Sequence, residues 1–139
     1  MNDTVIGLLG YITWILVLLV WLAVYRTLLV AKKQQAVNNF KADGSNSPAF
    51  GERLARAQGN CVESFAFMGG LMLLALATDL AVITNGLALL LLVARLGQSM
   101  THLISTSVLA VQIRFAFFLA QVGICFYWVV LFASKFIGA

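Results

Sequence analysis

The run from Thr4 to Tyr25 constrains this fold more than any other feature, because it is almost entirely apolar and carries no charged side chain. A helix needs about 20 predominantly apolar residues to cross the hydrocarbon core of a bilayer. The run is too long for the apolar part of a typical secretory signal, and no basic segment precedes it. We therefore expect it to be a retained membrane-spanning helix.

The remainder of the chain predicts further helices of the same kind. Of the 139 residues, 62% are hydrophobic and 10% are charged, whereas soluble domains are about 45–50% apolar and about 25% charged. The length allows one domain, residues 1–139, with about four spans. We expect an all-α integral membrane protein, a bundle of four transmembrane helices over residues 4–30, 51–78, 86–104 and 112–136, with a polar loop over 31–50. The start signal for the third helix is Thr84-Asn85-Gly86.

The basic residues predict the orientation of this bundle. The net charge is +4, and most of the nine Lys and Arg residues lie in or beside the first loop: Arg26, Lys32, Lys33, Lys41, Arg53 and Arg56. Cytoplasmic loops of membrane proteins carry such an excess. We therefore expect the basic segment 31–56 to be cytosolic and both termini to lie outside. In so apolar a chain the cluster does not indicate a nucleic-acid partner, and we expect membrane lipids as partners.

A polar stripe interrupts the second apolar helix. Arg56, Asn60 and Glu63 have the spacing i, i+4, i+7, which places them on one face at about 100° per residue. A charged side chain at the centre of a membrane span costs roughly 2.5–3.5 kcal/mol on insertion scales. The stripe must therefore face polar groups, water or a ligand, and it predicts a site inside the bundle.

Polar side chains recur in the next two helices. Arg95, Gln98 and His102 have the spacing i, i+3, i+7, while Arg114 and Gln121 are seven residues apart on one face. If the first loop is cytosolic, the polar halves of the second, third and fourth helices lie at the same depth in the membrane. We therefore expect one shared polar cavity that opens toward the cytosol.

Each of these residues also has a structural interpretation, which the sequence leaves open. Glu63 and Arg95 are each about half a span from the cytosolic edge, so a buried ion pair between them would mainly stabilise the bundle. Arg56 and Arg114 lie nearer the interface, where long basic side chains extend to water or to phospholipid headgroups. His102 is the only histidine, so we expect no metal site, and it could be a satisfied histidine of the bundle.

The functional interpretation of the same cavity is recognition of a small, anionic, hydrogen-bonding molecule from the cytosol. Arginine side chains bind carboxylates through two parallel hydrogen bonds. An arginine beside a bound thiol favours the thiolate, which lowers a thiol pKa that is normally about 8.5. An opening toward lipid would admit an apolar second substrate.

A longer signature surrounds the stripe and resembles a known family. The second helix contains Glu52-Arg53-Leu54-Ala55-Arg56-Ala57 before Asn60 and Glu63; the third contains Ala94-Arg95-Leu96, and the fourth begins with Gln112-Ile113-Arg114. These motifs resemble the membrane-associated proteins in eicosanoid and glutathione metabolism, the MAPEG family, and in particular its microsomal glutathione transferases. The resemblance is good over residues 51–121 and extends to the first helix by pattern alone. We expect a bacterial member, in an inner membrane in preference to the endoplasmic reticulum.

This resemblance implies a homotrimer of four-helix subunits, with glutathione bound as co-substrate between neighbouring subunits on the cytosolic side. It implies that Arg114 is the catalytic residue that stabilises the glutathione thiolate. The glutathione-binding positions that it implies are Arg56, Asn60, Glu63, Arg95, Gln98, His102 and Arg26.

The sequence departs from the family pattern at several of these positions. Gln98 and His102 stand where family enzymes often have His or Tyr and then Tyr four residues later, Phe118 and Phe115 replace a Tyr and a Ser of some members, and Gly59 replaces an Arg. Because Arg56, Asn60, Glu63 and Arg114 are retained, we expect a glutathione transferase that detoxifies hydrophobic electrophiles from the bilayer, and additional peroxidase activity is compatible with the site. The alternative is a non-catalytic scaffold that binds lipid or a small molecule. A transporter or channel has little support.

Overall fold

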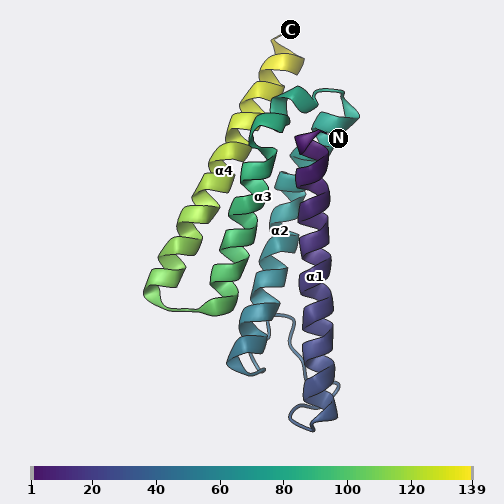
Figure 1. Cartoon of the computed structure of the whole chain (residues 1–139), viewed down its shortest axis with the longest axis vertical. Helices are drawn as coiled ribbons and strands as arrows, with labels where there is room; N and C mark the ends of the chain where they lie inside the picture. The colour runs from purple at the N-terminus through teal and green to yellow at the C-terminus, as the bar shows by residue number, and fades with distance from the viewer. Residues whose placement is uncertain (1, 139) are drawn as a thin grey trace.

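The computed structural model describes residues 2–138 and consists of four long helices: α1 (Asp3–Ala31), α2 (Ala49–Ala77), α3 (Ala81–Ile104) and α4 (Val108–Ile137). Each is long and apolar enough to cross a membrane. Successive helices run in opposite directions (Figure 1). The structure therefore confirms the expected all-α, four-helix integral membrane fold.

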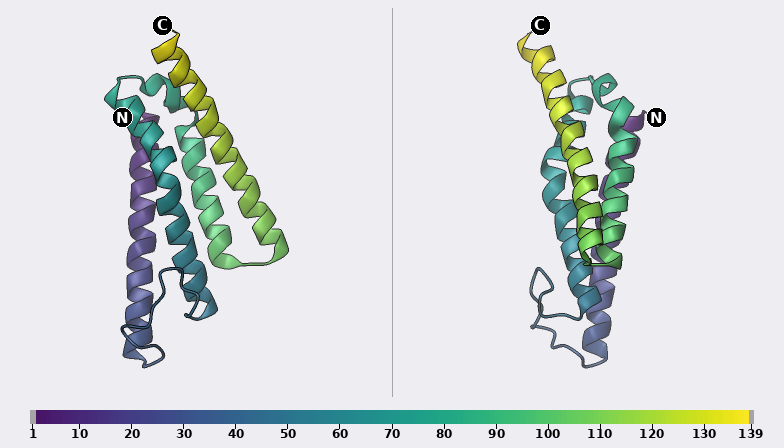
Figure 2. Two further views of the ribbon diagram at one scale, coloured as in Figure 1. Left: turned by 180° about the vertical axis from the view of Figure 1, so that it is seen from behind. Right: turned by 90° about the vertical axis from the view of Figure 1, so that its left-hand side faces the viewer.

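The two ends of the bundle differ in the segments that they carry. The connection between α1 and α2 and the short turn between α3 and α4 lie at one end, which we call the loop end (Figures 1 and 2). The N-terminus of α1, the C-terminus of α4 and the turn between α2 and α3 lie at the other end, which we call the termini end. The first half of α2, the second half of α3 and the first half of α4 are thereby near the loop end, as the sequence predicted for the polar halves.

Helix α3 is the central packing element. It contacts α1, α2 and α4, whereas α4 touches α2 only lightly. α1 approaches α3 closely through small residues: a Cβ on Gly7 would lie 3.0 Å from the backbone oxygen of Ala88. Small residues permit such close contacts in membrane bundles, where dispersion rather than hydrophobic burial drives association. Large apolar side chains such as Leu16, Leu90 and Phe126 are exposed outward, as expected for helices that face acyl chains.

Two helices end in left-handed residues that are not glycine. Lys33 follows α1 with φ 57°, and Asp79 follows α2 with φ 58°. In both cases the backbone N–H of the next residue donates a hydrogen bond to a carbonyl oxygen in the last turns of the helix. The N–H of Gln34 donates to the oxygen of Leu29 at 2.9 Å, and the N–H of Leu80 donates to the oxygen of Ala75 at 2.8 Å. These bonds satisfy carbonyl groups that the last turn of a helix leaves without partners.

Helices α3 and α4 begin earlier than the sequence predicted. α3 starts at Ala81 rather than at 86, and α4 starts at Val108 rather than at 112. Ser107 caps α4 by accepting a hydrogen bond from the N–H of Ala110 at 3.2 Å, an interaction typical of serine at this position. The polar residues interpreted as the start signal of the third helix lie inside α3 and bind another helix instead.

That interaction joins α1 to α3 at the termini end. The Thr4 hydroxyl lies 2.5 Å from the Thr84 hydroxyl and 2.6 Å from Oδ1 of Asn85. The backbone N–H of Thr4 donates to the same Oδ1 at 3.0 Å. Thr4 and Thr84 are fully buried, so this cluster satisfies both hydroxyls and one free N–H of the first turn of α1.

We predict that Thr4→Val destabilises the bundle by about 1 kcal/mol, since it removes the hydroxyl and leaves Thr84 without this partner, and interhelical hydrogen bonds in membrane proteins are worth roughly this much. Thermal unfolding in detergent micelles would measure the effect. The matched control is Thr27→Val, because the Thr27 hydroxyl is exposed and donates only to Ala23 of its own helix. Equal unfolding temperatures for the two variants would contradict the prediction.

Candidate functional site

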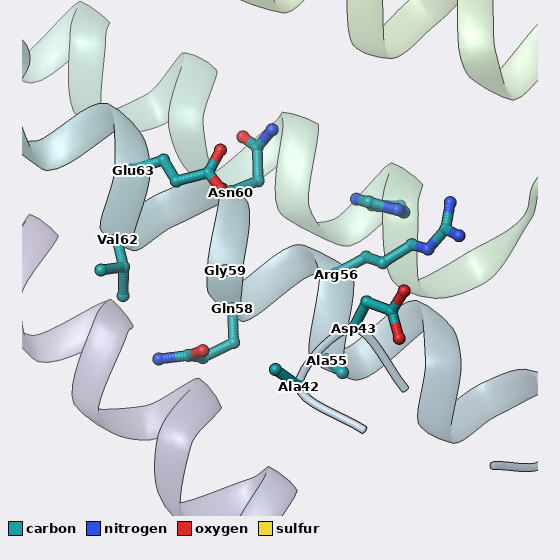
Figure 3. A pocket seen from close by; sticks show the side chains of 10 residues that line it. Ala42, Asp43, Ala55, Arg56, Gln58, Gly59, Asn60, Val62 and Glu63 are labelled. Carbon is teal, nitrogen blue, oxygen red and sulfur yellow. The ribbon is translucent and has the colours of Figure 1, made fainter. Parts of the chain in front are cut away.

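The polar stripe of α2 lines an open pocket near the loop end. Its volume is about 660 Å³, and Figure 3 shows its lining side chains. They come from α2, from α3 and from the connection between α1 and α2: Ala42, Asp43, Ala55, Arg56, Gln58, Gly59, Asn60, Val62, Glu63 and His102. We call this the polar pocket. It contains all three residues of the predicted stripe, together with one residue of the predicted third-helix set.

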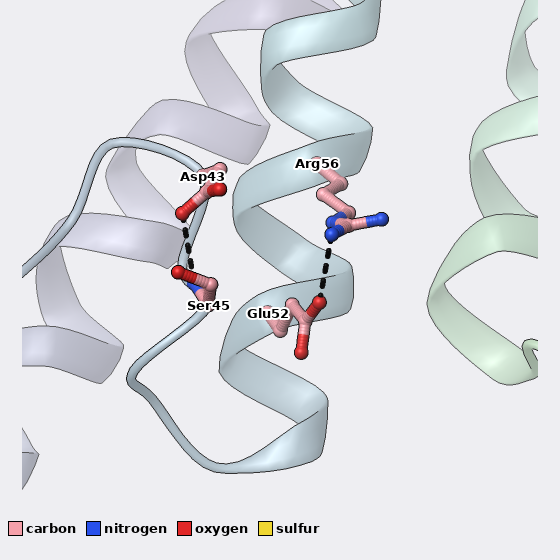
Figure 4. Close-up of polar contacts among 4 residues, drawn as sticks. All are labelled: Asp43, Ser45, Glu52 and Arg56. Carbon is pink, nitrogen blue, oxygen red and sulfur yellow. Dashed lines mark hydrogen bonds and ion pairs between the residues drawn. The ribbon is translucent and has the colours of Figure 1, made fainter.

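Arg56 is the cation of this pocket. Its guanidinium Nη2 lies 3.0 Å from Oε1 of Glu52, one turn earlier on α2 (Figure 4). This is the one ion pair within residues 2–138. The Arg56 side chain is 53% exposed, so the pair is weak, because exposed ion pairs contribute only about 0–1 kcal/mol. Arg56 is therefore only weakly restrained by Glu52 and remains available to a ligand.

A second pocket adjoins the first on the other side of Asn60. It has a volume of about 240 Å³ and lies among α2, α3 and α4; its lining residues are Asn60, Gln98, Val111, Arg114, Phe115 and Phe118. We call it the arginine–phenylalanine pocket. Nε of Arg114 is buried and has no hydrogen-bond partner in the described structure. An unpaired guanidinium N–H among apolar walls attracts an anion, because burying such a donor unpaired is costly.

Behind both pockets lies a buried polar network centred on Arg95, which is 1% exposed. Nε of Arg95 donates to Oε1 of Gln121 at 2.9 Å, and Nη1 donates to Oδ1 of Asn60 at 2.5 Å. Nη2 donates to the hydroxyl of Ser64 at 3.3 Å. The guanidinium also lies 5.9 Å from the centre of the Tyr11 ring, within the range of a cation–π interaction. Arg95 thus connects all four helices.

Gln121 extends this network to the arginine–phenylalanine pocket. Its Nε2 donates to Oε1 of Gln98 at 2.8 Å and to the backbone oxygen of Phe117 at 3.0 Å. Gln121 is fully buried and Gln98 is 6% exposed. The oxygen of Gln98 is therefore engaged by Gln121, and its amide N–H₂ group is the part that can donate to a molecule in the pocket.

The structure corrects the predicted pairing of Glu63 with Arg95. Arg95 binds only neutral acceptors among the described side chains, and Glu63 is an exposed residue at the rim of the polar pocket. The two residues share a depth in the membrane but not a direction. On α2, Ser64 and Asn60 face Arg95, whereas Glu63 is turned outward from the four-helix bundle. Depth can be read from sequence position, but the helix rotation that sets direction cannot.

Arg26 lies outside the two pockets. Its Nη2 donates to the backbone oxygen of Lys41 at 2.9 Å, and its guanidinium stacks 5.1 Å from the centre of the Phe40 ring. Within a single chain it therefore holds the connection between α1 and α2. Arg53, which the sequence placed in the family signature, likewise has a structural contact: Nε donates to the oxygen of Leu103 at 2.9 Å and so caps the end of α3.

Sequence reasoning missed several residues of the site. Asp43 and Gln58 line the polar pocket, and Ser64 contacts Arg95. Ser64 lies four residues after Asn60, a spacing that places both on one helix face and that could have identified it. Asp43 gave no such signal, because its position depends on the path of an irregular loop.

A comparison with known protein families shows to which family the chain belongs. The model of the MAPEG family matches residues 6–134, nearly the whole sequence. The chain belongs to the MAPEG family. Searches of the curated proteins and of the solved structures found no match. The family includes glutathione transferases and related proteins, and the matched region contains every residue of the two pockets and of the Arg95 network.

We predict that Gln121→Leu destabilises the protein by about 1–3 kcal/mol, because it leaves Nε of the buried Arg95 and Oε1 of Gln98 without their partner. The measurement is thermal unfolding in detergent. Gln112→Leu is the matched control, since it makes the same change at an exposed position of the same helix. The network would lose its assigned role if both substitutions shifted the unfolding temperature equally.

Proposed function

We propose that this MAPEG protein is a membrane glutathione transferase that conjugates glutathione to hydrophobic electrophiles dissolved in the bilayer, and so detoxifies them. The observation that carries the proposal is the junction of the two pockets at Asn60. A polar pocket with charged and amide side chains meets a smaller pocket with an unpaired arginine N–H and apolar walls. A tripeptide thiol has matching parts: charged and amide groups along the backbone and one sulfur to be activated.

The polar pocket supplies partners for the peptide. Arg56 suits a carboxylate, and Gln58 and Asn60 have amide groups that suit peptide N–H and C=O groups. His102 lines the same pocket, and although its side chain is only 8% exposed, its ring offers the ligand a further polar contact. Arg95 acts on this pocket through Asn60, whose oxygen it holds.

The arginine–phenylalanine pocket supplies the chemistry. A thiol bound beside Arg114 would lose its proton to solvent more readily, because the guanidinium stabilises the thiolate. The thiolate sulfur then attacks the electrophilic carbon, forms the C–S bond and expels the leaving group with its electron pair. Val111, Phe115 and Phe118 make this pocket apolar on its other sides, which suits a hydrophobic acceptor from the membrane. Peroxidase activity would use the same thiolate.

The exposed polar face of α2 supports assembly into an oligomer, and we propose the homotrimer of the family. Glu63 and Arg56 are exposed in the single chain although both belong to a membrane-spanning helix. Such residues almost always face a bundle interior or a water-filled cavity. A neighbouring subunit against α2 would provide that interior and would enclose the polar pocket. We further propose that the loop end is cytosolic, since the basic residues gather there.

Two observations favour the alternative of a non-catalytic scaffold. No side chain that lines the arginine–phenylalanine pocket carries a hydroxyl group, so the thiolate would have only N–H donors. In addition, a fully apolar pocket of about 270 Å³ lies between α2 and α4, lined by Phe67, Leu71, Val122, Cys125, Phe126 and Val129. A scaffold would bind a lipid chain there and would not turn over glutathione.

For the enzyme, we predict that Arg114→Ala lowers the rate of conjugation to a chloronitrobenzene acceptor by about tenfold or more, a cost typical of losing one charge-stabilising donor. Removing the guanidinium raises the pKa of the bound thiol, so the loss should be largest at low pH and should shrink as the pH rises toward the ordinary thiol pKa of about 8.5. Lys135→Ala, at the far end of α4, is the matched control. A loss of equal size at every pH would reject thiolate stabilisation by Arg114.

For ligand binding, we predict that glutathione stabilises the purified protein against heat, by about 2.7 kcal/mol at a concentration one hundred times its Kd. Arg56→Ala should reduce this stabilisation, while Lys32→Ala, an exposed loop variant, should keep it. An S-alkyl glutathione should stabilise at least as well, since its alkyl group fits an apolar pocket. Saturable glutathione binding without any conjugation would reject the enzyme, and co-purified lipid without glutathione stabilisation would favour the scaffold.

A further inference from the structure

Part of the connection between α1 and α2 rests directly on the polar pocket. Gly44 is buried although both of its neighbours are exposed. Its φ is +72°, and a Cβ there would lie 2.9 Å from Cα of Glu52 and from Cβ of Ala55. Only glycine combines this left-handed conformation with so close an approach. The backbone of residue 44 is therefore seated against the first turns of α2.

Polar contacts hold the same segment on its other side. Oδ1 of Asn46 accepts a hydrogen bond from the N–H of Lys41 at 3.1 Å, and its Nδ2 donates to the oxygen of Asn39 at 2.8 Å. Arg26 attaches this segment to α1 through the backbone oxygen of Lys41. The segment is irregular, yet it is fixed to two helices.

This seating places the carboxylate of Asp43 at the mouth of the polar pocket. Oδ1 of Asp43 accepts a hydrogen bond from the N–H of Ser45 at 2.9 Å (Figure 4). That hydrogen bond lowers the pKa of the Asp43 carboxyl below its usual value of 3.8, and the nearby charge of Arg56 contributes in the same direction. The carboxylate is thus oriented by its own turn and carries its charge at neutral pH.

The charges of the polar pocket suit a ligand that carries a cation as well as an anion. The lining contains one arginine, Arg56, which is only weakly paired with Glu52, and two carboxylates, those of Asp43 and Glu63. Figure 3 shows Asp43 and Arg56 at one end of the pocket and Glu63 with Asn60 at the other. A carboxylate and a guanidinium at one end match a ligand group that carries an ammonium and a carboxylate on the same carbon atom.

We propose that Asp43 is a specificity-determining residue, which binds the ammonium of the ligand's α-amino acid end while Arg56 binds the adjacent carboxylate. This inference rests on the proposed function and deepens it, because it assigns the γ-glutamyl end of glutathione to the loop end of the pocket. Gly44 is the positioning residue, since it seats the turn that aims Asp43. The thiol end then extends past Asn60 toward Arg114.

The test compares glutathione with glutaryl-cysteinylglycine, the same tripeptide without its amino group, by calorimetric titration of the full-length protein in detergent. The wild type should bind glutathione about five- to tenfold more tightly, as expected for a charge-assisted hydrogen bond. Asp43→Asn should abolish this preference by weakening glutathione binding alone. The asparagine keeps the acceptor for the Ser45 N–H, so the turn persists. Asp79→Asn is the matched control, an acid-to-amide change in the exposed turn at the termini end.

Each outcome of the titration has a distinct meaning. Equal binding of both tripeptides by the wild type would overturn the role of Asp43 and leave the proposed function intact. Preference lost in Glu63→Gln but kept in Asp43→Asn would also overturn it and assign the ammonium to Glu63. If the wild type binds neither tripeptide, the proposed function fails and the inference fails with it. Gly44→Ala, which displaces the turn without removing the charge, should reduce the preference as Asp43→Asn does.

Discussion

The fold depends on one buried cation that has no buried anion beside it. Arg95 is held by the oxygens of Gln121, Asn60 and Ser64 and by the face of Tyr11. Neutral acceptors avoid the cost of desolvating a second charge, which often exceeds the gain from a buried ion pair. They also fix geometry, because each acceptor comes from a different helix or from a different turn of the same helix. An apolar bundle in lipid has little to determine helix rotation, since lipid is as apolar as the side chains, and this network supplies that determination.

The positions of the two pockets follow from this network. Asn60 and Gln98 line the pockets with one part of each amide and bind the network with the other. Once Arg95 fixes the rotation of α2 about its axis, Arg56 and Glu63 must face the polar pocket. The fixed rotation of α4 through Gln121 likewise turns Arg114, two turns earlier, toward α2 and α3. The candidate site is thus oriented by the same hydrogen bonds that orient the helices.

The sequence predicted the four helices and many of the residues that line the two pockets, because hydropathy and helical periodicity are local properties. The stripe of Arg56, Asn60 and Glu63 could be placed on one face without knowledge of the neighbours. The residues that contact the stripe could not be predicted in this way, since Glu63 and Arg95 lie at the same depth in the membrane but point in different directions. The start of α3 was predicted too late for a related reason: Thr84 and Asn85 resemble a local start signal, but they contact Thr4 in another helix. Asp43 was missed because a loop has no periodicity from which its course could be inferred.

The double role of Asn60 has an evolutionary consequence. Its amide accepts from Arg95 and also faces both pockets, so a substitution there would disturb folding and any bound molecule together. A lineage that no longer used the ligand would still be expected to retain Asn60, Arg95 and Gln121 for stability. Arg56, Asp43 and Arg114, which lie outside that network, would drift first. Variation at Arg56, Asp43 and Arg114 among natural homologues, rather than the persistence of the central residues, would therefore be the better record of whether the proposed activity has been kept.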